Sequence, residues 1–110
     1  MGATTKVFNR YKVWYYGSYG LSTSYDALVY LYKDNVAVGR IEFLKDGTAA
    51  ASLKCALVEG LPCVRFEISR YADVMNLLRT EGPNLSVMIN DTSGVGSIGT
   101  NDYEDAGEAE

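Results

Sequence analysis

The chain has 110 residues and should fold as one domain, which we expect over residues 1–101. Its formal net charge of −4 belongs to the end of the chain: residues 102–110 hold five of the fourteen carboxylates, whereas residues 1–101 carry ten basic and nine acidic side chains, a balance of +1. The sequence has no histidine, which excludes a Ser-His-Asp triad and removes the commonest metal ligand.

The first predicted strand combines basic and aromatic residues. Residues 1–5 are small and polar, which indicates a frayed end. Residues 6–16 (KVFNRYKVWYY) have the alternation of a half-buried strand. One face would carry Val7, Tyr11, Val13 and Tyr15, and the other Phe8, Arg10, Lys12, Trp14 and Tyr16. Residues 17–24 (GSYGLSTS) predict a loop.

Four further strands are expected to complete an antiparallel meander. Residues 25–33 and 36–44 predict two strands, and Asp34-Asn35 between them suits a two-residue turn because both residue types tolerate positive φ. Residues 45–48 (KDGT) predict another hairpin turn and residues 49–58 a fourth strand. After a break at residues 59–62, the alternation of residues 63–68 predicts the fifth strand.

The spacing of apolar residues then changes to that of a helix. Ser69 is a suitable N-cap, and the apolar pattern predicts one amphipathic helix over about residues 69–81, which Gly82-Pro83 should end. Residues 85–89 and 95–100 flank a turn-forming segment and predict a short final hairpin. The fold class is therefore α+β, with one helix covering an antiparallel sheet, and residues 102–110 are expected to be a flexible acidic tail.

A single helix of about three turns is too small to cover both faces of such a sheet. The second and fourth predicted strands are nevertheless apolar on both sides. Barrel curling or a second copy of the chain would shield the remaining face, and we favour a homodimer.

The sequence offers little for catalysis, cofactors or metals. Three carboxylates on predicted strands are candidate acids: Asp26, Glu42 and Glu67. The alternative is that each is a solvated charge paired with a neighbouring arginine. Residues 94–99 (GVGSIG) match GxGxxG, but no helix follows, so we interpret their glycines as parts of a turn or bulge. We expect no enzyme activity, no cofactor and no metal site.

No stretch approaches the roughly 18 consecutive apolar residues of a membrane helix, and the first residues lack the apolar core of a signal peptide. We therefore expect a cytoplasmic protein. Cys55 and Cys63 fall on segments that should be neighbouring strands. Two buried thiols fit a reducing compartment, although the sequence leaves a disulfide open.

Binding is the function that the residue pattern favours. Arg10, Lys12, Trp14 and Tyr16 share one face of the first predicted strand, where cations could contact phosphate and rings could stack on bases. An ordinary exposed strand with an inward Trp is the structural alternative. The tyrosines of residues 15–32 fit a binding face or a core with its rim. The acidic tail is a solubilising end, a partner-binding peptide or an internal competitor for the basic strand.

Two resemblances accompany this interpretation. Residues 68–83 (ISRYADVMNLLRTEGP), with Ile98-Gly99-Thr100 and the acidic end, resemble a family of small uncharacterised bacterial proteins, which implies no particular activity. The order of several strands followed by a helix is similar to the Whirly and transcriptional-coactivator class, in which helices help join two sheets into a dimer that binds single-stranded DNA. The chain departs from that class in its weakly charged body and in the strands after its helix, so no functional residue is carried over.

These observations favour a non-enzymatic binding module for single-stranded nucleic acid. In that hypothesis Arg10 and Lys12 contact phosphate while Trp14 and Tyr16 stack bases. The alternative is a protein-interaction or scaffolding module that uses the same aromatic face or the acidic tail and binds no nucleic acid.

Overall fold

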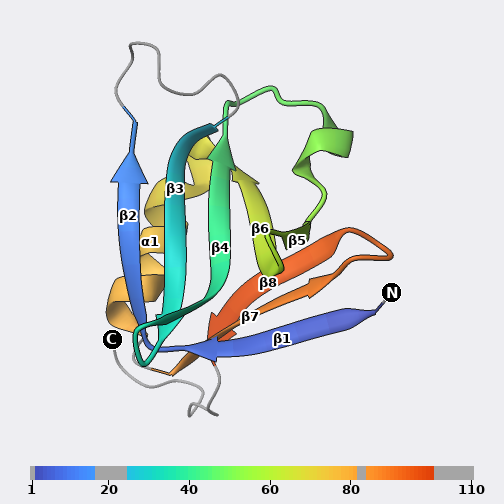
Figure 1. Ribbon diagram of the computed structural model, residues 1–110. Helices are drawn as coiled ribbons and strands as arrows, with labels where there is room; N and C mark the ends of the chain where they lie inside the picture. Colours follow the sequence, from blue (N-terminus) through green and yellow to red (C-terminus); the bar gives the residue numbers. More distant parts are fainter. Residues whose placement is uncertain (1, 17–24, 82–83, 101–110) are drawn as a thin grey trace, which may run out of the picture.

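The computed structural model describes residues 2–16, 25–81 and 84–100. Within these ranges eight strands, two short 3₁₀ helices and one α-helix form two sheets and a covering layer (Figure 1). The three-stranded sheet has the order β1-β7-β8 and the five-stranded sheet the order β2-β3-β4-β6-β5. The elements are β1 (Ala3–Phe8), β2 (Arg10–Tyr15), β3 (Tyr25–Lys33), β4 (Val36–Leu44), η1 (Ala50–Leu53), β5 (Ala56–Val58), β6 (Leu61–Glu67), η2 (Ile68–Arg70), α1 (Tyr71–Thr80), β7 (Leu85–Asn90) and β8 (Val95–Thr100).

The α+β class is confirmed, whereas the single five-stranded meander is wrong. The first predicted strand divides at Asn9, whose backbone N–H donates to the Tyr32 carbonyl at 2.9 Å. Before Asn9 the chain pairs with β7, and after it the chain pairs with β3. The predicted fraying is wrong for residues 3–5, which belong to β1. Phe8 leaves the predicted basic face and enters the core, where it is 1% exposed.

The hairpin of β3 and β4 is confirmed at its predicted bounds. Asp34 and Asn35 have φ values of 52° and 72°, as a two-residue turn of this hand requires. The strands pair antiparallel, with an irregularity between Leu31 and Tyr32. The predicted loop at residues 17–24 lies outside the described residues.

The predicted fourth strand is wrong over most of its length. Residues 45–48 do turn, but η1 follows, and only residues 56–58 form a strand, β5. Residues 49–52 are small and exposed, so they supply no large apolar face that a sheet could bury. The chain instead returns so that β6 pairs parallel with β4 and antiparallel with β5.

The helix begins two residues later than predicted. Arg70 is at the N-cap without a side-chain cap, and the Ser69 backbone N–H donates to Asp46 Oδ1 at 3.1 Å, so Ser69 is not the N-cap. The amphipathic character is confirmed because Val74, Met75 and Leu78 are buried. The predicted terminator at residues 82–83 lies outside the described part of the chain.

The final hairpin is confirmed, but it belongs to a separate sheet with β1. Asn90 Oδ1 accepts hydrogen bonds from the backbone N–H groups of Thr92 and Ser93, at 3.0 and 3.1 Å, and Gly94 has φ of 84°. The GVGSIG segment therefore forms a turn and the strand β8, as interpreted from its glycines.

One core joins the two sheets and the helix. Side chains from β1, β3, β4, β6, β7 and α1 form a continuous buried cluster, and α1 lies behind the five-stranded sheet in Figure 1. The face of the five-stranded sheet that is turned toward this core, its inner face, therefore packs against both α1 and the three-stranded sheet. The homodimer stays a prediction. The opposite face of the five-stranded sheet carries the predicted binding residues.

Candidate functional site

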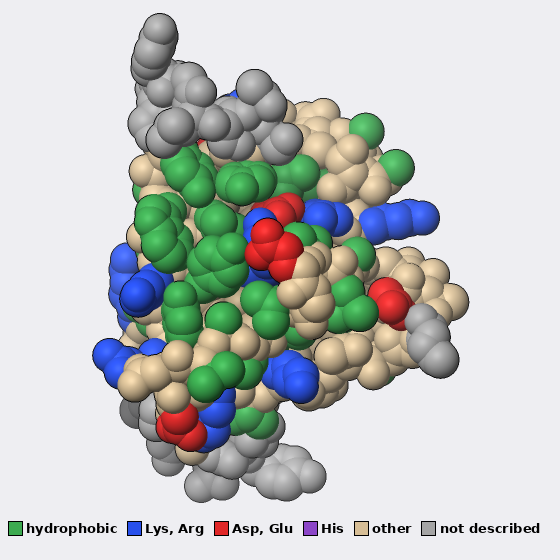
Figure 2. All heavy atoms as spheres, viewed as in Figure 1, with side chains coloured by type: hydrophobic (Ala, Val, Ile, Leu, Met, Phe, Trp, Pro, Cys, Tyr) green, Lys and Arg blue, Asp and Glu red, His purple; other side chains and the backbone are tan. Residues whose placement is uncertain are grey.

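The face of the five-stranded sheet turned away from α1 carries the candidate site, and we call it the outer face. Cross-strand pairing arranges its side chains in rows. The middle row contains Lys12, Tyr30, Arg40 and Cys63. The row on one side of it contains Trp14, Leu28, Glu42 and Arg65, and the row on the other side contains Arg10 and Tyr32. Figure 2 shows hydrophobic side chains over β2 and β3 and charged side chains beside them near the middle of this face.

The structure brings the four predicted binding residues to this face. Arg10 and Lys12 are exposed, Trp14 is 42% exposed, and Tyr16 is half-buried just beyond the end of β2. The Tyr16 ring lies 5.7 Å from the Tyr25 ring. Burial, followed by the charge and hydrogen bond of Tyr25, raises the pKa of Tyr16 above its ordinary value.

The exposed rings are held by contacts with their neighbours. Trp14 meets Tyr30 edge to face, with ring centroids 5.7 Å apart. Lys12 Nζ lies 5.6 Å above the Tyr32 ring, and the Arg40 guanidinium lies 5.3 Å from the centroid of Tyr30. These edge and cation contacts orient the rings without covering them fully, so they present partly fixed apolar surfaces.

A basic hollow of about 260 Å³ lies at one end of the outer face. It is lined by Arg10, Tyr11, Lys12, Tyr32 and Asn35, so none of its lining side chains is a carboxylate. Arg10 Nη1 donates to Asn35 Oδ1 at 2.7 Å, which fixes the guanidinium at the rim. A hollow with two cations and neutral donors suits an anionic group.

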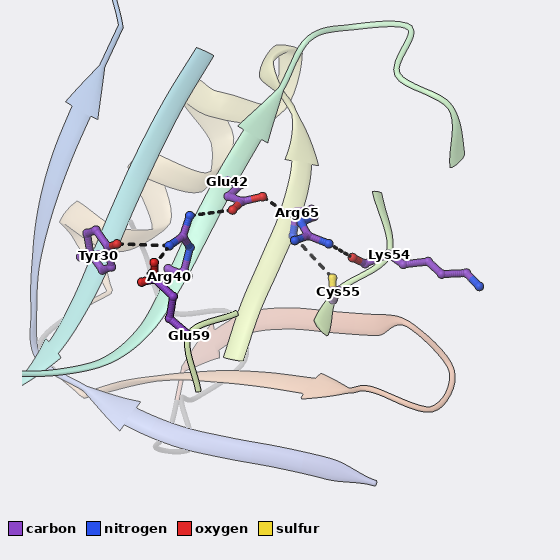
Figure 3. A network of polar contacts seen from close by, with 7 residues as sticks. All are labelled: Tyr30, Arg40, Glu42, Lys54, Cys55, Glu59 and Arg65. Carbon is purple, nitrogen blue, oxygen red and sulfur yellow. Dashed lines mark hydrogen bonds and ion pairs between the residues drawn. The ribbon is translucent and has the colours of Figure 1, made fainter. Parts of the chain in front are cut away.

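A buried ion network occupies the middle of the same face (Figure 3). Arg40 Nη2 donates to Glu42 Oε2 at 2.6 Å, and Arg65 Nε donates to Glu42 Oε1 at 2.8 Å. Arg40 Nη1 donates to the Tyr30 hydroxyl at 3.1 Å, and Arg65 Nη1 donates to the Lys54 carbonyl at 2.7 Å. Arg40 and Glu42 are only 5% and 7% exposed.

Sequence reasoning found the pairing in this network but missed its burial. Of the three candidate acids, Glu42 is buried between two arginines instead of solvated. Asp26 pairs with exposed Lys45, and Glu67 accepts the Gly47 backbone N–H at 3.0 Å. The signal that could have indicated the network is Arg40-x-Glu42 within an otherwise apolar strand, because charges in such a strand need partners.

The two arginines remain charged in spite of their burial. Burial alone lowers the pKa of Arg40, but the charge of Glu42 opposes it and the net pKa is raised. The pKa of Arg65 is also raised, because its hydrogen bond and attraction to Glu42 outweigh burial. The network is therefore a fixed arrangement of two cations and one anion.

Both cysteines are free and buried. Cys63 pairs with Ala56 in the register of β5 and β6, so Cys55, one residue before Ala56, belongs to the opposite face and joins the core. Cys55 Sγ accepts the Arg65 backbone N–H at 3.5 Å (Figure 3). The sequence left open whether Cys55 and Cys63 form a disulfide, and in the structure they are two free thiols.

We expect Cys63 to make folding stability depend on alkaline pH. Burial, followed by the nearby charge of Glu42, raises the pKa of the Cys63 thiol from 9.0 to about 12, although Arg65 and Arg40 oppose the shift. The unfolded chain then loses this proton first, so the stabilisation is complete below pH 9 and falls between pH 9 and 12 by at most about 1.4 kcal/mol per pH unit. Urea unfolding of the wild type and of Cys63→Ala across this range measures the effect, and a pH-independent difference would contradict it.

No group of three or more His, Cys, Asp or Glu side chains in the described ranges could hold a metal ion. No described helix is long and apolar enough to cross a bilayer. The described side chains of the site are aromatic rings, cations and the buried network.

Comparison of the chain with protein-family models, curated proteins and solved structures finds no match. The two resemblances noted from the sequence stay predictions. The outer face is therefore the basis for proposing a function.

Proposed function

We propose that this protein is a non-enzymatic binding module that holds single-stranded nucleic acid on its outer face. The observation that carries the proposal is the basic hollow of Arg10 and Lys12 on the same face as the exposed Trp14 ring. Single-strand binders combine cations for the backbone with rings for the bases, and sheets are a common platform for this arrangement.

In this proposal, different parts of the nucleic-acid strand contact different parts of β2. The hollow receives a phosphate, because Arg10 and Lys12 line it and none of its lining side chains is acidic. Trp14 lies four residues from Arg10, about 13 Å along an extended strand, and receives a base. Tyr16 is less exposed and adjoins Tyr25, so it borders the base site. Binding of this kind is weakly sequence-specific, since every base has a flat face.

Fluorescence anisotropy with a labelled single-stranded oligonucleotide at low salt tests the proposal. We expect Trp14→Ala to weaken binding by about 1–3 kcal/mol, since it removes a stacking surface. The matched control is Tyr15→Ala, because Tyr15 is the next residue of β2, 61% exposed, and packs against Tyr71 on the other side of the sheet. Lys12→Ala should lower the slope of log affinity against log salt by about 1. Lys6→Ala, which removes an exposed side chain from β1 in the other sheet, should leave this slope unchanged.

The measurement is made on the full chain and on a chain without residues 102–110. Tighter binding after the deletion would support an internal competitor. Absence of binding by both chains at low salt would exclude the proposal. A protein partner retained in a Trp14-dependent manner would then favour the interaction module.

A further inference from the structure

Arg40 keeps unused hydrogen-bonding capacity although it is buried. Its Nε atom has no hydrogen-bond partner. Its Nη1 atom faces a Glu59 carboxylate oxygen at 3.6 Å, which is an ion-pair distance but too long for a hydrogen bond. Glu42 divides its two oxygens between Arg40 and Arg65, so two guanidinium groups share one buried carboxylate. The network therefore has a surplus positive charge, which Glu59 partly balances.

Glu59 reaches Arg40 from a backbone position that does not suit glutamate. Glu59-Gly60 is the two-residue turn between β5 and β6, with φ values of 54° and 80°. Asn or Gly is favoured where such turns require positive φ, and a longer side chain is strained there. The Glu59 side chain is 69% exposed, so packing does not hold it in place. The contact that the structure gives the Glu59 side chain is its ion pair with Arg40.

We propose that Arg40 is a phosphate-binding site and that Glu59 is a built-in competitor that the phosphate displaces. The ion pair between buried Arg40 and exposed Glu59 is weak because its 3.6 Å distance is too long for a hydrogen bond, whereas a phosphate group accepts short, charge-assisted hydrogen bonds from a guanidinium. When phosphate displaces the Glu59 carboxylate, the negative charge of the phosphate takes over the balancing of the network. The inference rests on the proposed function in one respect: the phosphate belongs to the bound nucleic-acid strand.

The position of Arg40 fits a strand that crosses the sheet. Lys12, Tyr30 and Arg40 lie side by side on β2, β3 and β4. Two strand spacings separate Lys12 from Arg40, about 10 Å. The Tyr30 ring lies between the two cations and contacts Arg40 and Trp14. One nucleic-acid strand can therefore meet a cation, a ring and a second cation in succession.

Glu59→Asn tests the competitor without harming the turn, because Asn favours the backbone conformation of position 59. We expect the variant to bind inorganic phosphate and the labelled oligonucleotide about two- to five-fold more tightly at low salt, the range of a weak exposed ion pair. Its unfolding midpoint should be unchanged or higher. Asp73→Asn is the matched control, since it removes the same charge from an exposed position on α1, behind the sheet.

Nuclear magnetic resonance of the arginine side chains gives a readout independent of nucleic acid. Addition of inorganic phosphate should shift the Arg40 Nε–Hε resonance, and should do so at lower concentration in Glu59→Asn. An unmoved Arg40 resonance in both proteins, or equal gains in Glu59→Asn and Asp73→Asn, would overturn the inference. If the resonance responds as expected but no oligonucleotide binds, the phosphate site stands and only the nucleic-acid function fails.

Discussion

Glu42→Ala should lower the free energy of unfolding by about 3–5 kcal/mol. Glu42 is 7% exposed and accepts hydrogen bonds from Arg40 and Arg65. Its removal leaves the buried Arg40 guanidinium with only the exposed Glu59 carboxylate, 3.6 Å away, as a counter-charge, and it removes the carboxylate partner of Arg65. The cost is mainly that of a poorly paired buried cation, since an intact buried pair contributes little net stability.

Urea unfolding at neutral pH measures this loss, and a surface ion pair provides the control. Asp26 pairs with Lys45, which is 54% exposed, so Asp26→Ala should cost no more than about 1 kcal/mol. Glu42→Gln keeps a hydrogen-bond acceptor and the shape of the side chain but removes the charge. Its loss of unfolding free energy should lie between those of Glu42→Ala and Asp26→Ala. A Glu42→Ala variant as stable as Asp26→Ala would show that the network is not buried as described.

Gly96→Ala is the second substitution with a large expected effect, about 1–3 kcal/mol of destabilisation. A Cβ atom at Gly96 would lie 2.7 Å from Cys55 Sγ, 2.9 Å from Cys55 Cβ and 3.1 Å from the Met88 carbonyl oxygen. Cys55 is buried and already accepts the Arg65 backbone N–H, so it has little freedom to move. The new methyl group therefore forces β8 away from the β5 side of the molecule.

Gly99→Ala is the matched control on the same strand. A Cβ atom at Gly99 meets no other atom within 4 Å, so this change should alter stability by less than about 0.5 kcal/mol or raise it slightly. Chemical denaturation of both variants gives the comparison. Equal stabilities would mean that β8 does not approach Cys55 as closely as described.

Local sequence signals predicted the turns, strands and helix whose conformation depends on residues that are neighbours in the sequence. Asp34-Asn35 gave the β3–β4 turn because these residues accept positive φ, and the strands on either side follow from their apolar content. The period of Val74, Met75 and Leu78 gave the amphipathic helix. The basic and aromatic face of β2 followed from simple alternation, and its exposure is confirmed for Arg10, Lys12 and Trp14.

Long-range contacts were not predictable in the same way. The division of the first predicted strand at Asn9 depends on the pairing of β1 with β7, about eighty residues away in the sequence. The residues next to Asn9 continue the strand pattern and do not predict this division. The parallel pairing of β4 with β6 depends on how the small residues 49–52 leave the sheet. Glu59 could not be connected with Arg40 because the contact depends on the β5–β6 turn folding over the outer face.

The sequence by itself determined an α+β chain with one amphipathic helix and a strand that presents Arg10, Lys12 and Trp14 together, since period and turn chemistry are encoded within a few neighbouring residues. Only the tertiary structure decided that there are two sheets, that Glu42 is buried between Arg40 and Arg65, and that this buried network lies on the same face as the exposed Trp14. Those features arise from which distant strands meet, because burial and charge compensation depend on the whole packed molecule.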